Sequence, residues 1–254
     1  MLVDGRRSGP ANLLALVASH GPSAGGGLFP DMGQDGEPVF VTGERIIWSG
    51  RMHVGFLRQR ANNRPLDRIW ELPEPAEVWL TDRRLVFTCK KFTEGDWKTA
   101  WMDWTEFLAS SVNSIRAELK RYGRRAVGQI RYEWPTSIEL MRRRVRMRQV
   151  SYLGVDCVDP WDDAIVRLVL FDKSAEHVAG LTRMIVTASA AYRLNRSLPA
   201  GAEALLRQQA DCPVTADQTH PFGSGPGDSG QLPSLDPGAT LTFPLPGAIK
   251  ISGA

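Results

Sequence analysis

The feature that most constrains the fold of this chain is a pair of short runs, residues 77–81 and 85–89, on either side of the polar residues 82–84. Both runs are rich in β-branched and aromatic residues, and three polar residues between them are enough for a tight turn. Side chains alternate between the two faces of a strand, so Val78 and Leu80 share one face. The sequence therefore predicts an antiparallel hairpin with one buried side.

Similar runs on both sides of this hairpin predict further strands. They are residues 39–41, 45–48 and 52–57 before it, and residues 97–104, 127–134, 146–155 and 165–171 after it. Gly43, Gly50 and Pro135 are typical breaks between such strands. Many short strands in succession predict a strongly bent antiparallel sheet whose open end needs a cover.

Two other stretches carry apolar residues at helical spacing. In residues 104–121 the apolar positions recur every three or four residues, which predicts an amphipathic helix. The second stretch, residues 174–195, has Ser174 as an N-cap and Arg193 in its last turn, and both residue types stabilise those ends of a helix. A proline then stops the pattern, and a short extra helix is expected within residues 198–210.

The hairpin also carries a recognisable motif. Its sequence, VWLTDRRLVF at residues 78–87, resembles the Leu-Thr-Asn/Asp-basic-Arg-Leu hairpin of GRAM and bacterial PH-like domains, and GERIIW at residues 43–48 is similar to the strand that those domains carry upstream. The resemblance implies an α+β fold: a PH-like, partly open antiparallel β-barrel with a C-terminal capping helix. The helix near residues 104–121 would be an insertion. Such a scaffold implies binding of lipid headgroups or peptides, and no enzyme chemistry.

Glycine and proline divide the chain into four parts. Many of the 24 Gly and 17 Pro lie at the two ends, where few apolar residues can offset the entropy of ordering. We expect a disordered segment at residues 1–36, the PH-like domain at residues 37–197, a short helix at residues 198–210, and a Pro/Gly-rich tail at residues 211–254.

Arginine carries most of the positive charge, and it is densest at residues 142–148. If this run is extended, alternate arginines project from one face at intervals of about 6–7 Å and could meet membrane phosphates or an acidic protein. The residues concerned are Arg142, Arg144, Arg146 and Arg148, and a second basic group near the end of the first predicted helix comprises Lys120, Arg124 and Arg125. A solvated strand face that discourages edge pairing is the simpler interpretation, and a binding face is the alternative.

Apolar residues return near the end of the tail, at Leu241, Phe243 and Leu245. A short extended segment of this kind can add a strand to the edge of a sheet, either in a partner or in the same chain. The sequence therefore indicates a candidate docking segment, with a plain tail as the alternative.

Nothing in the sequence points to catalysis or to a bound cofactor. The three cysteines have unrelated spacings without Cys-x-x-Cys, and the four histidines are scattered, so no zinc site or catalytic triad is visible. A net charge of +3 is too small to indicate a nucleic-acid partner, because phosphate binding needs clustered cations. We expect no metal, no cofactor and no nucleic acid.

The sequence thus favours a non-enzymatic binding or adaptor module that recognises an acidic protein or peptide. A peripheral membrane protein that binds anionic lipid headgroups is one alternative, and an enzyme of unrecognised class is another. No run approaches the roughly 18–20 apolar residues that span a bilayer, so we expect a cytoplasmic bacterial protein, with membrane-peripheral contact left open. The oligomeric state stays open too.

Overall fold

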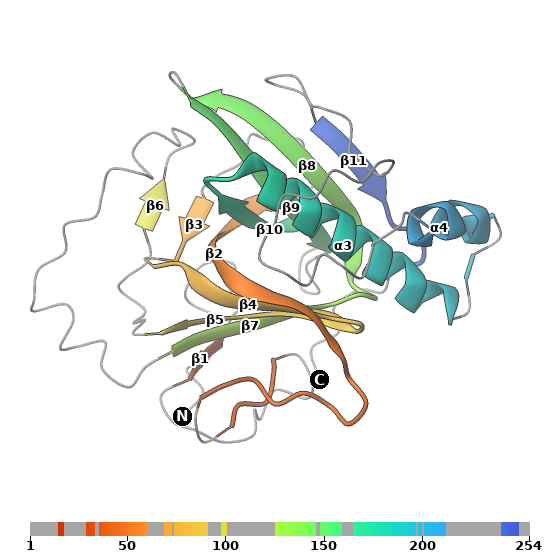
Figure 1. Cartoon of the computed structure of the whole chain (residues 1–254), viewed down its shortest axis with the longest axis horizontal. Coiled ribbons are helices and arrows are strands. Elements are labelled where there is room, and N and C mark those ends of the chain that lie inside the picture. Colours follow the sequence, from red (N-terminus) through yellow and green to blue (C-terminus); the bar gives the residue numbers. More distant parts are fainter. Residues whose placement is uncertain are drawn as a thin grey trace, which may run out of the picture.

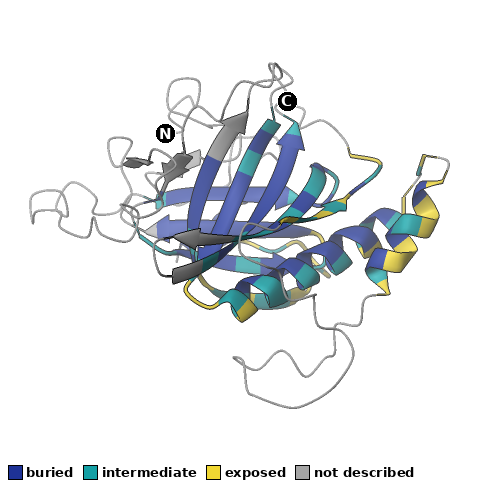
Figure 2. Ribbon diagram, turned by 90° about the horizontal axis from the view of Figure 1, so that it is seen from above, coloured by how far each residue is buried: buried dark blue, intermediate teal, exposed yellow. Residues whose placement is uncertain are grey.

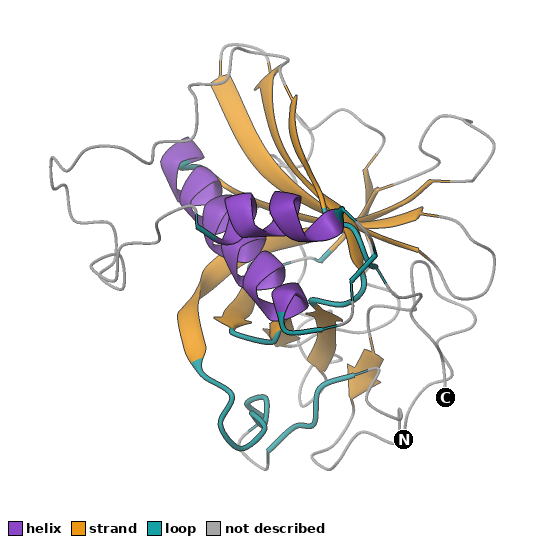
Figure 3. Ribbon diagram, turned by 90° about the vertical axis from the view of Figure 1, so that its right-hand side faces the viewer, coloured by secondary structure: helices purple, strands orange, loops and turns teal. Residues whose placement is uncertain are grey.

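The computed structural model describes residues 15–17, 29–33, 36–59, 69–72, 74–90, 98–100, 125–145, 148–158, 165–196, 198–199, 201–211 and 240–248, and all structural statements below concern these residues. They form a bent antiparallel sheet with two helices on one side of it (Figures 1 and 3). The predicted α+β class and the incomplete closure of the sheet are therefore confirmed.

The sheet has eleven strands. They are β1 (Ala15–Val17), β2 (Ile46–Gln59), β3 (Ile69–Glu71), β4 (Ala76–Thr81), β5 (Arg84–Lys90), β6 (Lys98–Ala100), β7 (Arg125–Arg131), β8 (Pro135–Val145), β9 (Arg148–Val158), β10 (Ile165–Asp172) and β11 (Thr240–Pro244). Their order is β1-β7-β5-β4-β2-β10-β9-β8-β11, with β3 paired to β2 and to β6 beside this path. Strands β1 and β11 are the two ends and do not pair with each other.

Strand β2 connects the two halves of the sheet. Its first part, as far as Met52, pairs with β4, and its second part, from His53, pairs with β10. The prediction of two strands divided at Gly50 was wrong, because the glycine lies inside one continuous strand. A Cβ at Gly50 would lie 2.5 Å from the Trp48 ring, so this position needs glycine to let the ring lie across the backbone.

The predicted hairpin is strands β4 and β5, paired from Leu80 and Leu85 onward. Both Val78 and Leu80 are completely buried, which confirms the predicted inner face. Strand β8 had not been predicted, because Pro135 was interpreted as a break. Proline is tolerated as the first residue of a strand, which is where Pro135 lies.

Helix α3 (Ala175–Leu194) has Ser174 as its N-cap and Asn195 as its C-cap, so the predicted helix is confirmed at both ends. The Ser174 hydroxyl accepts a hydrogen bond from the His177 amide, which satisfies one free donor of the first turn. The face toward the sheet is buried and the outer face is more exposed (Figure 2). Helix α4 (Ala202–Ala210), the predicted short helix, contacts α3.

Two short parts of residues 1–36, the segment expected to be disordered, are among the described residues and pack on the sheet. Strand β1 pairs with β7, and Met32 is buried against Val127. The predicted helix at residues 104–121 lies outside the described residues. Within the part that is described, no helix combines the length and the apolarity needed to cross a bilayer.

Candidate functional site

The polar residues of the hairpin motif form a buried hydrogen-bond network. Nε and Nη2 of Arg84 each donate to the carboxylate of Glu44 at 2.8 Å, and Nη1 donates to Gln129 at 2.7 Å. The Thr81 hydroxyl donates to the same carboxylate at 2.8 Å, and it accepts the amide of Arg84 across the turn. The motif thus fixes the turn and joins it to the segment before β2, and its side chains are used for structure.

Glu44 is the acidic centre of this network, and its side chain is fully covered. Burial alone raises the pKa of a carboxyl group. Hydrogen bonds from Arg84, from the Val41 amide and from Thr81 outweigh it, so the pKa of Glu44 is lowered from 4.5. Glu44 is therefore ionised and paired at neutral pH.

The arginines of residues 142–148 do not form one extended face. The chain turns after Val145, which pairs with Arg148 on the neighbouring strand, so Arg142 and Arg144 lie on β8 and Arg148 lies on β9. Arg142 is half-buried opposite Ser151. Arg146 lies outside the described residues. The interpretation that required a single row of four arginines is therefore wrong.

The second basic group is described only at Arg125, since Lys120 and Arg124 lie outside the described residues. Arg125 begins β7, and its guanidinium donates to the carbonyl of Gly36. Strand β7 is not a neighbour of β8 in the sheet. Arg125 therefore holds the segment before β2, and no shared surface with Arg142 is formed through strand pairing.

The predicted docking segment lies on the sheet of its own chain. Strand β11 pairs antiparallel with β8, with Leu241 opposite Leu140 and Phe243 opposite Ile138. Exposure alternates along β11: Leu241 and Phe243 pack against the core, and Leu245 is 2% exposed. The three apolar residues that the sequence singled out are thus the inward-facing residues of an added strand.

Arg193 of α3 holds the end of this segment. The residue is 2% exposed, and its guanidinium donates to the carbonyls of Leu245 at 2.7 Å and Pro246 at 2.9 Å. Further hydrogen bonds reach the carbonyls of Tyr132 and Pro135, on either side of the turn between β7 and β8. This one side chain therefore connects its own helix, α3, to the start of β8 and to the C-terminal segment.

The charge of Arg193 is maintained in this buried position. Burial lowers the pKa of Arg193 to about 10, partly offset by nearby Cys157 and Glu133. The guanidinium is still protonated at neutral pH. A positive charge that donates to four carbonyl dipoles is well suited to hold backbone of any sequence.

Two more hydrogen bonds fix the docked segment. The amide of Leu245 donates to the Thr136 carbonyl at 2.9 Å, which continues the strand pairing past Pro244. The side-chain amide of Gln209, on α4, donates to the Pro244 carbonyl at 3.0 Å. We call the surface that receives the segment the tail site, defined by residues 136–141 of the β8 edge with Val186, Arg193 and Gln209.

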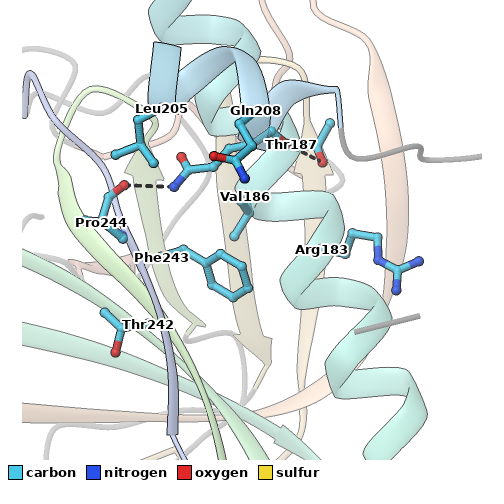
Figure 4. Close-up of a pocket in the computed structure, with 9 residues that line it drawn as sticks. Arg183, Val186, Thr187, Leu205, Gln208, Thr242, Phe243 and Pro244 are labelled. Atoms are coloured by element: carbon cyan, nitrogen blue, oxygen red, sulfur yellow. Dashed lines mark hydrogen bonds between the residues drawn. The ribbon is translucent and has the colours of Figure 1, made fainter. Parts of the chain in front are cut away.

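A cavity of about 320 Å³ opens between the docked segment and the two helices (Figure 4). Apolar side chains from all three elements face it, namely Val186, Leu205 and Phe243. The polar lining comes from Arg183, Thr187, Gln208, Gln209 and Thr242. The docked segment thus fills the tail site only in part.

The remaining polar clusters have structural roles. Arg167 on β10 makes a bidentate pair with Asp156 at 2.6 and 2.7 Å and reaches Glu139 at 2.8 Å, across three adjacent strands. His177 contacts Asp172, and the Trp48 ring lies edge-on to it with centroids 5.5 Å apart. Within the described residues, no group of three or more His, Cys, Asp or Glu side chains is placed to bind a metal ion.

Arg193 and Gln209 had not been predicted as site residues. Arg193 was interpreted as a cation near the C-terminal end of the helix dipole. A signal was present in the helical spacing, because steps of four residues from Leu181 lead through Ile185 to Arg193 on the buried face. An arginine on an apolar face must find acceptors, and here they are carbonyl oxygens.

Comparison with known proteins provides no relative from which a role could be transferred: no protein-family model, no curated protein and no solved structure matches this chain.

Proposed function

We propose that this chain is a binding module that recognises an extended peptide segment by adding it as a strand to the outer edge of β8, and that its own C-terminal segment occupies this site in the free protein. The observation that carries the proposal is the docked strand β11. Three features of this strand support the proposal: backbone pairing with β8, alternate side chains turned inward, and a buried anchor at Leu245.

The contacts at the tail site indicate what kind of segment fits. Arg193 and Gln209 bind carbonyl oxygens, which every peptide carries, so selectivity must come from the inward positions now held by Leu241, Phe243 and Leu245. The matching ligand has apolar side chains at alternate positions. It needs no acidic residue along this part of β8.

A ligand could also carry acidic residues immediately before the part that docks, where they would lie beside basic residues of β8. Strand β8 continues past Met141, the partner of Thr240, to Val145. A longer ligand in the same antiparallel register would extend along the positions of Arg142 and Arg144. We therefore infer a ligand whose apolar part is preceded by acidic residues, which keeps the basic residues of β8 within the function.

The architecture supports a PH-like scaffold as the basis of this module. Strand β2 joins the two halves of a bent antiparallel sheet. One long helix, α3, follows β10 in the chain and lies across this sheet. These are the features that the hairpin motif implied. Strand β11 then takes an edge that the open sheet leaves available.

The proposal can be tested on the full-length chain with Leu241→Asp and Leu245→Asp, which should release the tail site. A fluorescent peptide of residues 236–248 should bind this variant, as measured by anisotropy, and bind the wild-type chain at least about tenfold more weakly because its own segment competes. Exposed Thr240→Asp in the same chain provides the control and should behave like wild type.

Circular dichroism of the released variant would show whether the fold survives. A folded variant that does not bind the peptide, or binds a scrambled peptide equally well, would contradict the proposal.

A second candidate, membrane attachment, is favoured by three exposed apolar side chains that lie close together in the sequence. Val39, Val41 and Ile46 are 47%, 56% and 46% exposed. Exposed Arg45 and Arg83 lie nearby, since the Val41–Glu44 turn leads into Arg45 and the Arg83 guanidinium lies over Gly43. Apolar side chains beside arginines suit the interface of an anionic bilayer.

Flotation with phosphatidylserine vesicles tests this second candidate. The wild-type chain should float at low salt and less at high salt, and Val41→Asp with Ile46→Asp should abolish flotation. Flotation that this double variant leaves unchanged would eliminate these residues as a membrane contact.

A further inference from the structure

Strand β8 offers little more backbone pairing beyond the point where the docked segment leaves it. Pairing reaches the amide of Leu245, which donates to the Thr136 carbonyl at 2.9 Å. The next residue along this edge, Pro135, has no amide hydrogen. The amide of Trp134 already donates to the Arg131 carbonyl at 3.0 Å. A ligand strand that continued straight would therefore find no free amide at these two positions.

The contacts of Arg193 show that the docked segment turns at this point. One nitrogen atom, Nη1, donates to the carbonyl of Leu245 at 2.7 Å and to that of Pro246 at 2.9 Å. Successive carbonyls of a straight strand point in opposite directions, so a single donor reaches both only where the chain turns. Arg193 therefore binds a turn that follows the anchor Leu245, in addition to the extended segment.

Pro246 and Gly247 form this turn. Gly247 has a φ of 79°, and a proline followed by a residue with positive φ is the signature of a type II turn. A Cβ at Gly247 would lie 3.4 Å from Cδ of Pro199 and 3.7 Å from Cδ2 of Leu198, so the segment between α3 and α4 lies beside the turn. We call Arg193, Leu198 and Pro199 the turn end of the tail site.

We propose that ligands of the tail site carry a Pro-Gly pair directly after the apolar anchor, so that the recognised pattern is apolar-x-apolar-x-Leu-Pro-Gly. The apolar residues occupy the inward positions along β8, and the turn places two carbonyls at Arg193 where straight pairing ends. The proline also keeps the anchor residue before it extended, so less conformational entropy is lost on binding. This inference rests on the proposed strand addition and names the backbone feature that selects its ligands.

The turn excludes most other apolar strands from the tail site. Alternate apolar residues are common in strands, so the inward positions alone give little selectivity. Most L side chains at the position of Gly247 would force a disfavoured conformation, and a straight segment would lose the contact to the Pro246 carbonyl. The Pro-Gly pair is therefore the part of the ligand that discriminates.

Four peptides of residues 236–248 test the inference by fluorescence anisotropy against the full-length chain with Leu241→Asp and Leu245→Asp. One is unchanged, two carry L-alanine or D-alanine at position 247, and one carries Pro246→Ala. The L-alanine peptide should bind at least about fivefold more weakly than the unchanged peptide, because an L-residue disfavours a positive φ. D-alanine has the opposite preference at the same composition, so its peptide should bind at least as tightly as the unchanged one. Pro246→Ala should weaken binding about two- to fivefold.

Failure of the turn and failure of strand addition give different results. If no peptide binds, the proposed strand addition fails. The inference about the turn alone is overturned if the unchanged peptide binds and either the L-alanine or the Pro246→Ala peptide binds equally well. It is also overturned if the D-alanine peptide binds as weakly as the L-alanine peptide.

A measurement within one chain avoids any need to release the tail. Gly247→Ala in the otherwise wild-type protein should speed hydrogen exchange at the Leu245 amide at least about fivefold, because the docked state is destabilised. Gly43→Ala is the matched control, since Gly43 has a φ of 77° but lies in the turn before β2. It should leave exchange at Leu245 unchanged. Unchanged exchange in the Gly247→Ala chain, or equal acceleration by both substitutions, would also overturn the inference.

Discussion

Arg193 donates a hydrogen bond to the main-chain carbonyl of Leu245 at 2.7 Å, across a separation of 52 residues in the chain. All of its hydrogen bonds within the described residues go to carbonyl oxygens, from the turn before β8 and from the C-terminal segment. The helix, the sheet edge and the tail are thus held by one cation that recognises backbone.

Replacing this cation should destabilise the protein strongly. Arg193→Met keeps much of the side-chain volume and leaves the carbonyls of Tyr132, Pro135 and Leu245 buried without their donor. We expect the free energy of unfolding, measured by urea titration, to fall by at least about 3 kcal/mol. Arg196→Met, on the exposed side of the same helix end, is the control and should change it by less than about 1 kcal/mol. Equal effects of the two substitutions would contradict the special role of Arg193.

The inward-facing leucines of the docked segment should contribute unequally to the free energy of docking. Leu245 is almost fully buried, whereas Leu241 is half-buried. Leu245→Ala should weaken docking by about 2–4 kcal/mol and Leu241→Ala by about 1 kcal/mol, which hydrogen exchange of the β11 amides would report. Exposed Thr240→Ala should leave exchange unchanged. A Leu241→Ala effect larger than that of Leu245→Ala would not fit the docked geometry.

The Glu44 network should make stability depend on pH. The pKa of Glu44 is lowered in the folded protein, because the hydrogen bonds from Arg84, Val41 and Thr81 outweigh the effect of burial. A lowered carboxyl pKa stabilises the fold above the unfolded value of 4.5, and that contribution is lost as the pH falls through the folded pKa. Urea titrations between pH 7 and pH 3 should therefore show a smaller loss of stability below about pH 4.5 for Glu44→Gln than for wild type. Parallel pH profiles for the two proteins would refute the assignment.

The ion pair of Arg167 with Asp156 should be coupled far more strongly than a surface pair. It is bidentate, and the Asp156 side chain is 8% exposed. A double-mutant cycle with Arg167→Met and Asp156→Ala should give a coupling energy of about 1–3 kcal/mol. The same cycle at Arg207 and Glu203, an exposed pair on α4, should show no measurable coupling. Similar coupling at the two sites would argue against the geometry at Asp156.

Local patterns in the sequence predicted the elements that depend on nearby residues. The hairpin of β4 and β5 follows from alternation around a short turn, and α3 follows from its periodicity and from the Ser174 cap. The sequence also predicted that Leu241 and Phe243 lie on the same face of a strand, because the alternation of apolar and polar residues is a property of the segment itself.

What could not be predicted depends on contacts between distant residues. The partner of β11 is β8, about a hundred positions earlier in the chain, and no local pattern encodes that pairing. Strand β8 was hidden because Pro135 resembles a break and because arginines at its far end resemble a surface patch. The tail site could not be predicted either, because Arg193 and Gln209 belong to it only through contacts with the distant C-terminal segment.

The place of β11 in the sheet also affects how this protein stays in solution. An uncovered β8 would present a row of unpaired amide and carbonyl groups, which is a template for pairing with other chains and for aggregation. The tail covers part of this edge and replaces it with the outer edge of β11, which has five residues against eleven in β8 and ends in a proline, so it is a poorer template. Arg193 holds the tail in this place. Under the strand addition proposed above, release of the tail and capture of a partner segment must be closely coupled in time, so that the long edge of β8 is not left uncovered.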